Sequence, residues 1–169
     1  QNFTITAATP QLFISSPNGG EQLYPGTAVG IYWSNNYVPG SFVKLEYSTD
    51  SGSTWTSIIN NTSLSTGFFN WLVPNIPTTR AYVRISSSSL PNVMDTSNAV
   101  FTIRPFLTIT SPVTPGLSYP SCSNQYIYFE KSPVITSVKV DYSTDSMATW
   151  TTFSNSYSVG GSRWSPERL

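Results

Sequence analysis

The feature that most constrains the fold is a segment that occurs twice in the chain. VKLEYSTDSGSTWT begins at Val43, and VKVDYSTDSMATWT begins at Val138. Two shorter matches, LFISSP with LTITSP and the YP pair at Tyr24 with the one at Tyr119, share the same offset of 95 residues without a gap. A constant offset through loops as well as strands indicates a duplicated unit about as long as an immunoglobulin-like domain.

The repeated unit has the alternation of half-buried antiparallel strands. In FVKLEYS, for example, Val43 and Leu45 share one face while Lys44 and Glu46 share the other. No long segment has helical periodicity, and turn residues separate seven such strands between positions 12 and 103. We therefore expect an all-β fold, with tandem immunoglobulin-like antiparallel β-sandwiches. The alternation predicts these inward positions in the first repeat: Val29, Ile31, Trp33, Val43, Leu45, Tyr47, Phe69, Trp71, Ala81, Val83, Ile85, Ala99, Phe101 and Ile103.

The repeat boundaries divide the chain into three parts. Residues 1–10 are either the last strand of a preceding repeat or an N-terminal arm, because NFTIT resembles VFTIR at Val100–Arg104. Residues 11–104 form a complete sandwich. Residues 105–169 form a second one that lacks its last two strands, because the chain ends soon after GGSRW, the counterpart of GFFNW. A strand of another chain that pairs beside Val138 would complete it.

Charge and residue types exclude several classes of function. The chain has 8 basic and 8 acidic residues, and charged residues make up only 9% of it, against about 25% in an average soluble domain. We therefore expect no nucleic-acid partner and no anionic membrane surface. Histidine is absent, which excludes Ser-His-Asp and Cys-His nucleophile systems and argues against a zinc site. No apolar run approaches the roughly 20 residues of a membrane span.

Paired carboxylates remain the main option for catalysis. Glu46 and Asp50 lie close together in sequence, and Asp141 and Asp145 repeat them. A glycosidase places two such groups on opposite sides of a cleft, whereas Glu46 is expected on the outside of a strand and Asp50 in a turn. Both are interpreted as solvated side chains. Asp50 or Asp95 could bind calcium together with loop carbonyls, but a single carboxylate is weak support for such a site. We predict no catalytic residue, metal or cofactor.

The aspartate of YSTDSGSTW belongs to a recognisable motif. Ser48, Asp50, Gly52 and Trp55 form the pattern S-x-D-x-G-x-x-W, which resembles the Asp-box of sialidases and related β-propellers. The resemblance implies a cap on a β-hairpin, away from any catalytic centre. The residue types agree, because an aspartate accepts hydrogen bonds from turn amides and a glycine adopts positive φ at low cost.

The second copy of the motif is altered. Ser143, Asp145 and Trp150 are retained, but Met147 replaces the glycine. We expect this turn either to differ from the first or to be strained.

The wider pattern extends the resemblance to a family. SPNGGEQLYPGTAVGIYWS, VKLEYSTDSGSTWTSI, GFFNWLVP and the segment that ends in AVFTI together resemble the immunoglobulin/fibronectin-like repeat of large secreted bacterial surface proteins. Such repeats are common in Bacteroidetes cargo of type IX secretion, and they are similar to the amino-terminal domain of the fungal Kre9/Knh1 family. The resemblance implies an extracellular, non-catalytic structural or adhesive module, of the kind that also occurs in filaments. Its partners would be neighbouring repeats, glycans or cell-surface proteins.

Cys122 is the one cysteine of the chain. The family resemblance implies a disulfide for some members, from a cysteine before the second strand to one early in the sixth. In the second repeat that partner would lie beyond Leu169. The alternatives are a buried free thiol and, least favoured because no cation is nearby in sequence, a reactive thiol.

Three tyrosines fall on outward or loop positions of the first repeat, namely Tyr32, Tyr37 and Tyr82. Scattered surface tyrosines are common and need no function, but exposed tyrosines can also form a platform for sugars or a protein contact. They support an alternative function, a carbohydrate-binding accessory module of a secreted hydrolase. A coplanar cluster of exposed aromatic rings on one face would favour that alternative over a spacer.

Overall fold

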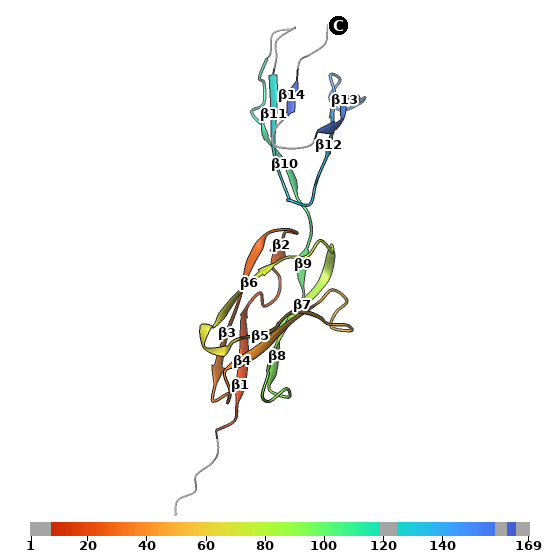
Figure 1. The fold of residues 1–169 in the computed structure, drawn as a ribbon. Helices are drawn as coiled ribbons and strands as arrows, with labels where there is room; N and C mark the ends of the chain where they lie inside the picture. Colours follow the sequence, from red (N-terminus) through yellow and green to blue (C-terminus); the bar gives the residue numbers. More distant parts are fainter. Residues whose placement is uncertain (1–7, 119–124, 158–161, 165–169) are drawn as a thin grey trace, which may run out of the picture. The chain divides into compact units, whose positions relative to one another are not determined.

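The computed structural model describes residues 8–118, 125–157 and 162–164. The chain divides into two compact units, residues 1–104 and 105–169 (Figure 1). The described residues of both units are built from β-strands, with one short 3-10 helix in the first unit.

The first unit is a sandwich of two sheets. One sheet has the strand order β1-β3-β6, and the other has the order β2-β9-β7-β4-β5 with β8 beside β7. All pairs are antiparallel except β2 with β9, which is parallel. The elements are β1 (Gln11–Ser16), β2 (Gln22–Leu23), β3 (Ala28–Asn36), β4 (Phe42–Ser48), β5 (Thr56–Ser63), η1 (Leu64–Thr66), β6 (Phe68–Leu72), β7 (Thr78–Ser87), β8 (Met94–Thr96) and β9 (Phe101–Ile103).

The NGGE segment carries the chain from one sheet to the other between β1 and β2. The Glu21 carboxylate accepts hydrogen bonds from the backbone amides of Asn18 and Gly19, at 2.7 and 2.8 Å. Gly19 has a φ of 122°, and a Cβ placed on it would lie 2.5 Å from the Cβ of Ala99. The crossing therefore needs a glycine at this point, both for its backbone conformation and for the close approach of Ala99.

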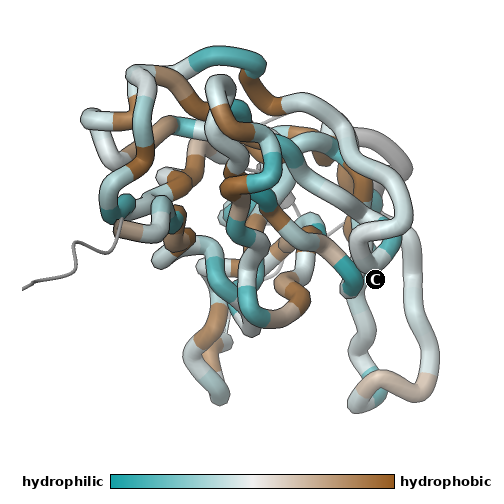
Figure 2. Tube along the Cα trace, turned by 90° about the horizontal axis from the view of Figure 1, so that it is seen from below, coloured by the Kyte–Doolittle hydropathy of each residue, from teal (hydrophilic) through white to brown (hydrophobic). Residues whose placement is uncertain are grey.

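Alternate residues of the strands fill the space between the sheets. Trp71 from one sheet meets Phe101 from the other edge to face, with ring centroids 6.3 Å apart, and Tyr47 lies 5.4 Å from Trp71. The predicted inward positions are confirmed as buried or partly buried, with Ala99 as the exception. Ala99 precedes β9, and its Cβ faces Gly19 of the NGGE crossing, where it remains exposed. Brown and teal segments are interspersed along the trace in Figure 2.

The second unit repeats five strands of the first unit, all from before β7. Its elements are β10 (Leu107–Ser111), β11 (Gln125–Lys131), β12 (Val138–Tyr142), β13 (Thr151–Tyr157) and β14 (Ser162–Trp164). The order β10-β11-β14 matches β1-β3-β6, and the pair β12-β13 matches β4-β5.

The gap-free offset between the repeats is wrong for one strand. Ser16 pairs with Tyr32 in the first unit, and Ser111 pairs with Tyr128 in the second. β10 therefore lies 95 residues after β1, whereas β11 lies 96 residues after β3. An extra residue before β11 and a missing one after it keep the apolar side chains of β11 facing inward, because a shift of one residue would turn every side chain to the opposite face.

The inner face of the second unit is open in the part of the chain that the structure describes. Leu12 and Ile14 are 3% and 5% exposed, whereas their counterparts Leu107 and Ile109 are 51% and 57% exposed. In the first unit, β7 and β8 lie against β1, and β7 also pairs with β4. Among the described residues β12 pairs with β13 alone, so the counterpart of β1 has no such cover.

Candidate functional site

The hairpin between β4 and β5 is held by the aspartate of the repeated motif. The carboxylate of Asp50 accepts hydrogen bonds from the amide of Thr54 at 2.9 Å, from its hydroxyl at 2.6 Å and from the hydroxyl of Ser48 at 2.7 Å. The hydroxyl oxygen of Ser48 in turn accepts from the amides of Asp50 and Gly52, at 3.2 and 2.8 Å. These hydrogen bonds all begin and end within the turn.

The backbone of this turn is left-handed at two successive residues. Ser51 has a φ of 62° and Gly52 a φ of 84°. The ring of Trp55 lies beside the turn, since a Cβ on Gly52 would be 3.5 Å from Trp55 Cζ2. The guanidinium carbon of Arg84 sits 4.1 Å from the centroid of that ring, a cation-π distance. Trp55 thus links the hairpin to the neighbouring strand β7.

The hydrogen bonds of the turn keep Asp50 ionised. Those donated by Thr54, and then that of Ser48, lower the pKa of Asp50 from 3.8 to about 2. A general acid or base works best when its pKa lies near the working pH. Asp50 is therefore suited to holding the turn and is poorly suited to transferring protons near neutral pH.

The second hairpin has the same hydrogen bonds despite its methionine. Asp145 accepts from the amide of Thr149 at 2.8 Å, and the oxygen of Ser143 accepts from the amide of Met147 at 2.9 Å. The prediction is a turn that differs or is strained; the hydrogen bonds are the same, so of these two alternatives only strain applies. Met147 has a φ of 71°, which is a strained conformation for a residue with a side chain. Trp150, the counterpart of Trp55, is exposed.

Glu46 corrects the expectation of a solvated carboxylate. It is only 7% exposed, because Lys44 and Arg84 cover it from both sides. Lys44 Nζ lies 2.6 Å from one carboxylate oxygen, and Arg84 donates two hydrogen bonds to the other, at 2.7 and 3.1 Å. Burial raises the pKa of Glu46, but the hydrogen bonds from Lys44 and Arg84 outweigh burial and hold the pKa below its usual value.

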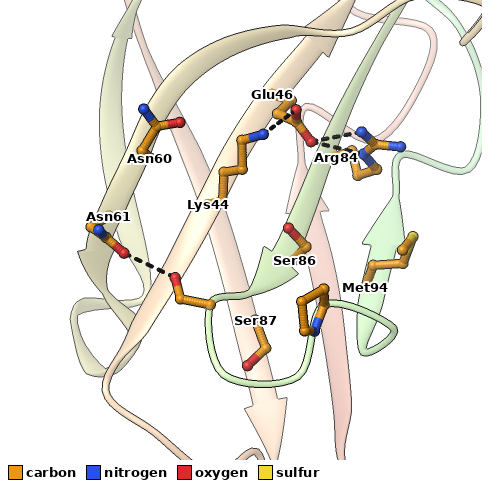
Figure 3. Close-up of a pocket in the computed structure, with 10 residues that line it drawn as sticks. Lys44, Glu46, Asn60, Asn61, Arg84, Ser86, Ser87 and Met94 are labelled. Carbon is orange, nitrogen blue, oxygen red and sulfur yellow. Dashed lines mark hydrogen bonds and ion pairs between the residues drawn. The ribbon is translucent and has the colours of Figure 1, made fainter.

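This ion cluster lies in a shallow polar depression of about 490 Å³ on the outer face of β4, β5 and β7 (Figure 3). Glu46 is the one acidic residue among those that line it, and both of its oxygens are engaged. The depression therefore lacks the second carboxylate of a glycosidase pair. The other lining residues are Asn60, Asn61, Ser86, Ser87, Ser88, Pro91 and Met94.

The remaining acidic candidates also have partners. Lys139 Nζ lies 3.0 Å from Asp141, repeating the pair of Lys44 with Glu46. Asp95, considered for calcium, accepts a hydrogen bond from the backbone amide of Ile14 at 2.7 Å and so ties β8 to β1. No group of three or more potential metal ligands occurs among the residues that the structure describes.

The three predicted tyrosines do not form one surface. Tyr32 projects from the outer face of β3, whereas Tyr82 projects from the outer face of β7 in the opposite sheet. Tyr37 lies just after β3, exposed and with a φ of 53°. The ring beside Tyr32 is Phe68, which the sequence interpretation missed. Alternation in GFFNW places Phe68 outward, but only the pairing of β3 with β6 brings it next to Tyr32.

Cys122 lies outside the described residues, between Ser118 and β11. Its three alternatives remain predictions.

Comparison with known proteins gives one similarity of low degree. No protein-family model and no curated protein matches the chain. Among solved structures, the chain is similar to the fibronectin(III)-like modules of Clostridium thermocellum CbhA, with 16% identity and a TM-score of 0.31 over 91% of this chain and 78% of that one. The all-β sandwich is established by the two sheets and the core between them. The described residues contain no helix long and apolar enough to cross a membrane.

Replacing Met147 by glycine should stabilise the second unit. The substitution removes the strain of a side chain at positive φ and keeps every hydrogen bond of the turn. We expect a gain of about 1 kcal/mol in the free energy of unfolding of that unit. Gly52→Ala is the matched control and should cost the first unit a similar amount. Urea denaturation followed by amide hydrogen exchange reports each unit separately, and an unchanged or lower stability of Met147→Gly would contradict the strain.

Acid should weaken the hairpins through their aspartates. The folded pKa of Asp50 and of Asp145 is about 2, below the roughly 3.9 of an unfolded chain. Ionised aspartate therefore stabilises the fold above about pH 4, and this contribution is lost as the pH falls through the folded value. The urea midpoint of the wild type should fall more between pH 4 and pH 2 than that of the Asp50→Asn, Asp145→Asn variant. Parallel pH profiles would show that these carboxylates do not support the turns.

Proposed function

We propose that the chain is an extracellular structural or adhesive repeat module of a larger secreted or cell-surface protein, and that it is not an enzyme. It spaces or presents neighbouring domains. The observation that carries this proposal is the connection between the two units.

The connection consists of a single residue between two anchored ones. The amide of Arg104 donates to the carbonyl of Leu23 at 3.1 Å, which fastens it to the first unit. The amide of Phe106 donates to the hydroxyl of Ser132 at 2.8 Å, and its carbonyl accepts from the amide of Ser132 at 2.9 Å. Only Pro105 lies between these anchors, and its ring restricts φ. Such a connection suits a spacer, because it leaves little conformational freedom between repeats.

The chemistry of the acidic groups supports a non-catalytic module. The most specific motif of the chain uses Asp50 and Asp145 to close hairpins, and both carboxylates bond within their own turns. Glu46 is held by two cations. The resemblance to repeats of secreted bacterial surface proteins supports the extracellular part of the proposal.

We expect the two units to tumble together in solution. NMR relaxation of backbone amides gives a rotational correlation time for each unit. In the wild type both values should be those of one particle of 18.6 kDa. Insertion of a flexible Gly-Ser segment of about ten residues after Pro105 should shorten both values, because such linkers behave as random coils. A wild type whose units already tumble independently would contradict the spacer, whatever the insertion does.

We also propose that a strand of a neighbouring repeat covers the open side of the second unit. An apolar cavity of about 130 Å³ lies there between the two small sheets. Its apolar lining, with Leu107, Ile109, Phe129 and Val138, corresponds to core positions of a complete sandwich, and the ion pair of Lys139 with Asp141 lines it as well. β7 of the first unit shows what fits, because it pairs with β4 and turns Ala81, Val83 and Ile85 inward.

A peptide with the sequence of β7 should bind to this edge. The probe is TTRAYVRISS, residues 78–87, and its control carries serine in place of the three inward residues. Backbone pairing gives affinity and alternate side chains give specificity in this mode of binding. We expect slower amide hydrogen exchange in β12 with the probe and no change with the control. Equal exchange with both peptides would contradict the proposal.

A further inference from the structure

The outer face of the sheet β1-β3-β6 differs from the rest of the surface in its chemistry. None of the three strands, QLFISS, AVGIYWSNN and FFNWL, contains a charged residue. The side chains that point outward are aromatic, aliphatic, amide or hydroxyl groups. In the opposite sheet, the outer face carries Lys44, Glu46 and Arg84.

Two aromatic rings lie next to one another on this neutral face. Tyr32 and Phe68 are cross-strand partners of β3 and β6, two strands that run side by side in Figure 1. Their ring centroids are 6.2 Å apart, and the planes differ by 27°. The two residues are 50% and 47% exposed. This separation is that of an offset pair rather than a face-to-face sandwich, so the rings form a broad aromatic surface open to solvent.

The ring of Tyr32 lies along the sheet because Gly30 leaves room for it. A Cβ on Gly30 would be 2.5 Å from Tyr32 Cε2 and 2.9 Å from the hydroxyl oxygen. Asn70, whose side chain is exposed, is the cross-strand partner of Gly30. An amide that can both donate and accept hydrogen bonds therefore stands beside the tyrosine ring.

The second unit has a ring pair on the corresponding strand of its own sheet, β11. Tyr128 occupies the position of Tyr32, as the pairing with Ser111 shows. Its ring lies 6.1 Å from that of Tyr126, again with 27° between the planes, and both residues are 50% exposed. Tyr126 is the counterpart of Gly30. In the first unit the ring of Tyr32 lies over Gly30, whereas in the second unit Tyr126 places a ring of its own there. An aromatic pair therefore recurs, but Glu130 lies two residues further along β11 on the same exposed side, so this face of the second unit is not neutral.

We propose that the outer face of β1-β3-β6, centred on Tyr32 and Phe68, binds a neutral extended polysaccharide. Flat aromatic faces pack against the apolar C–H faces of sugar rings, and Asn70 offers hydrogen bonds to sugar hydroxyls. The absence of charge from the three strands favours an uncharged ligand, because a charged one would lose hydration without gaining a counter-charge. This inference is independent of the spacer function.

Native affinity electrophoresis tests the proposal. The probes are hydroxyethyl cellulose and glucomannan, both neutral, with polygalacturonate as the anionic comparison. The wild type should be retarded by at least one neutral probe and not by the anionic one. Phe68→Ala should weaken binding roughly two- to tenfold, the value of one aromatic contact. Combining it with Tyr32→Ala should abolish the retardation, because both rings of the aromatic surface are then removed.

Matched variants separate loss of contact from loss of fold. Tyr32→Phe keeps the ring over Gly30 and should bind as the wild type does. Tyr82→Ala removes a tyrosine from the opposite sheet and should also leave binding unchanged. Urea midpoints show whether each variant remains folded.

Three results would overturn the proposal. The first is a wild type that neither neutral probe retards. The second is a folded Phe68→Ala variant with undiminished binding. The third is a wild-type dimer that Phe68→Ala converts to a monomer in sedimentation, which would assign the face to contact between two copies of the chain.

Discussion

Burial of every second side chain between the two sheets is the constraint on which the other features depend. It directs Ile31 and Trp33 into the core and leaves Tyr32 on the outside, and it turns Glu46 and Arg84 to the outer face of the opposite sheet. The same constraint explains why β11 gained one residue before it and lost one after it. An uncompensated change would have exposed the apolar set and buried the polar one, so only the pair of changes keeps the inner face apolar.

The two hairpins show that local hydrogen bonds can preserve a turn even where the core between the sheets is incomplete. The second unit has an open inner face among the described residues, and its turn has a methionine where the first has glycine. The carboxylate of Asp145 nevertheless holds the same bonds as that of Asp50. The motif persists because the hydrogen-bond partners of each aspartate lie within a few residues of it in sequence. The register of β10 with β11, by contrast, depends on two segments that are far apart in sequence.

Features decided by a single strand or turn could be predicted from the sequence, and features decided by pairing could not. Alternation gave the all-β sandwich and its inward positions, and the motif gave the residues of the hairpin. The burial of Glu46 was missed because Arg84, its cover, lies 38 residues away on another strand. Phe68 was missed for the same reason, since nothing in the sequence shows that it pairs with Tyr32. Ala99 was misplaced because the sequence does not show where β9 begins.

Because the chain has few charged residues, its exposed strand edges need other means of preventing pairing with other chains. Many proteins place lysines along an exposed edge to prevent pairing with other chains. Only 9% of the residues of this chain are charged, so few lysines are available for this purpose. In the first unit, Asp95 instead occupies the amide of Ile14 on the edge strand β1, and β7 fills the edge of β4. The described part of the second unit has neither safeguard at β10 and β12. One added strand with alternating apolar and polar side chains would pair with the backbone groups of such an edge and cover the apolar inner face beside it. Contact between neighbouring repeats would take this form.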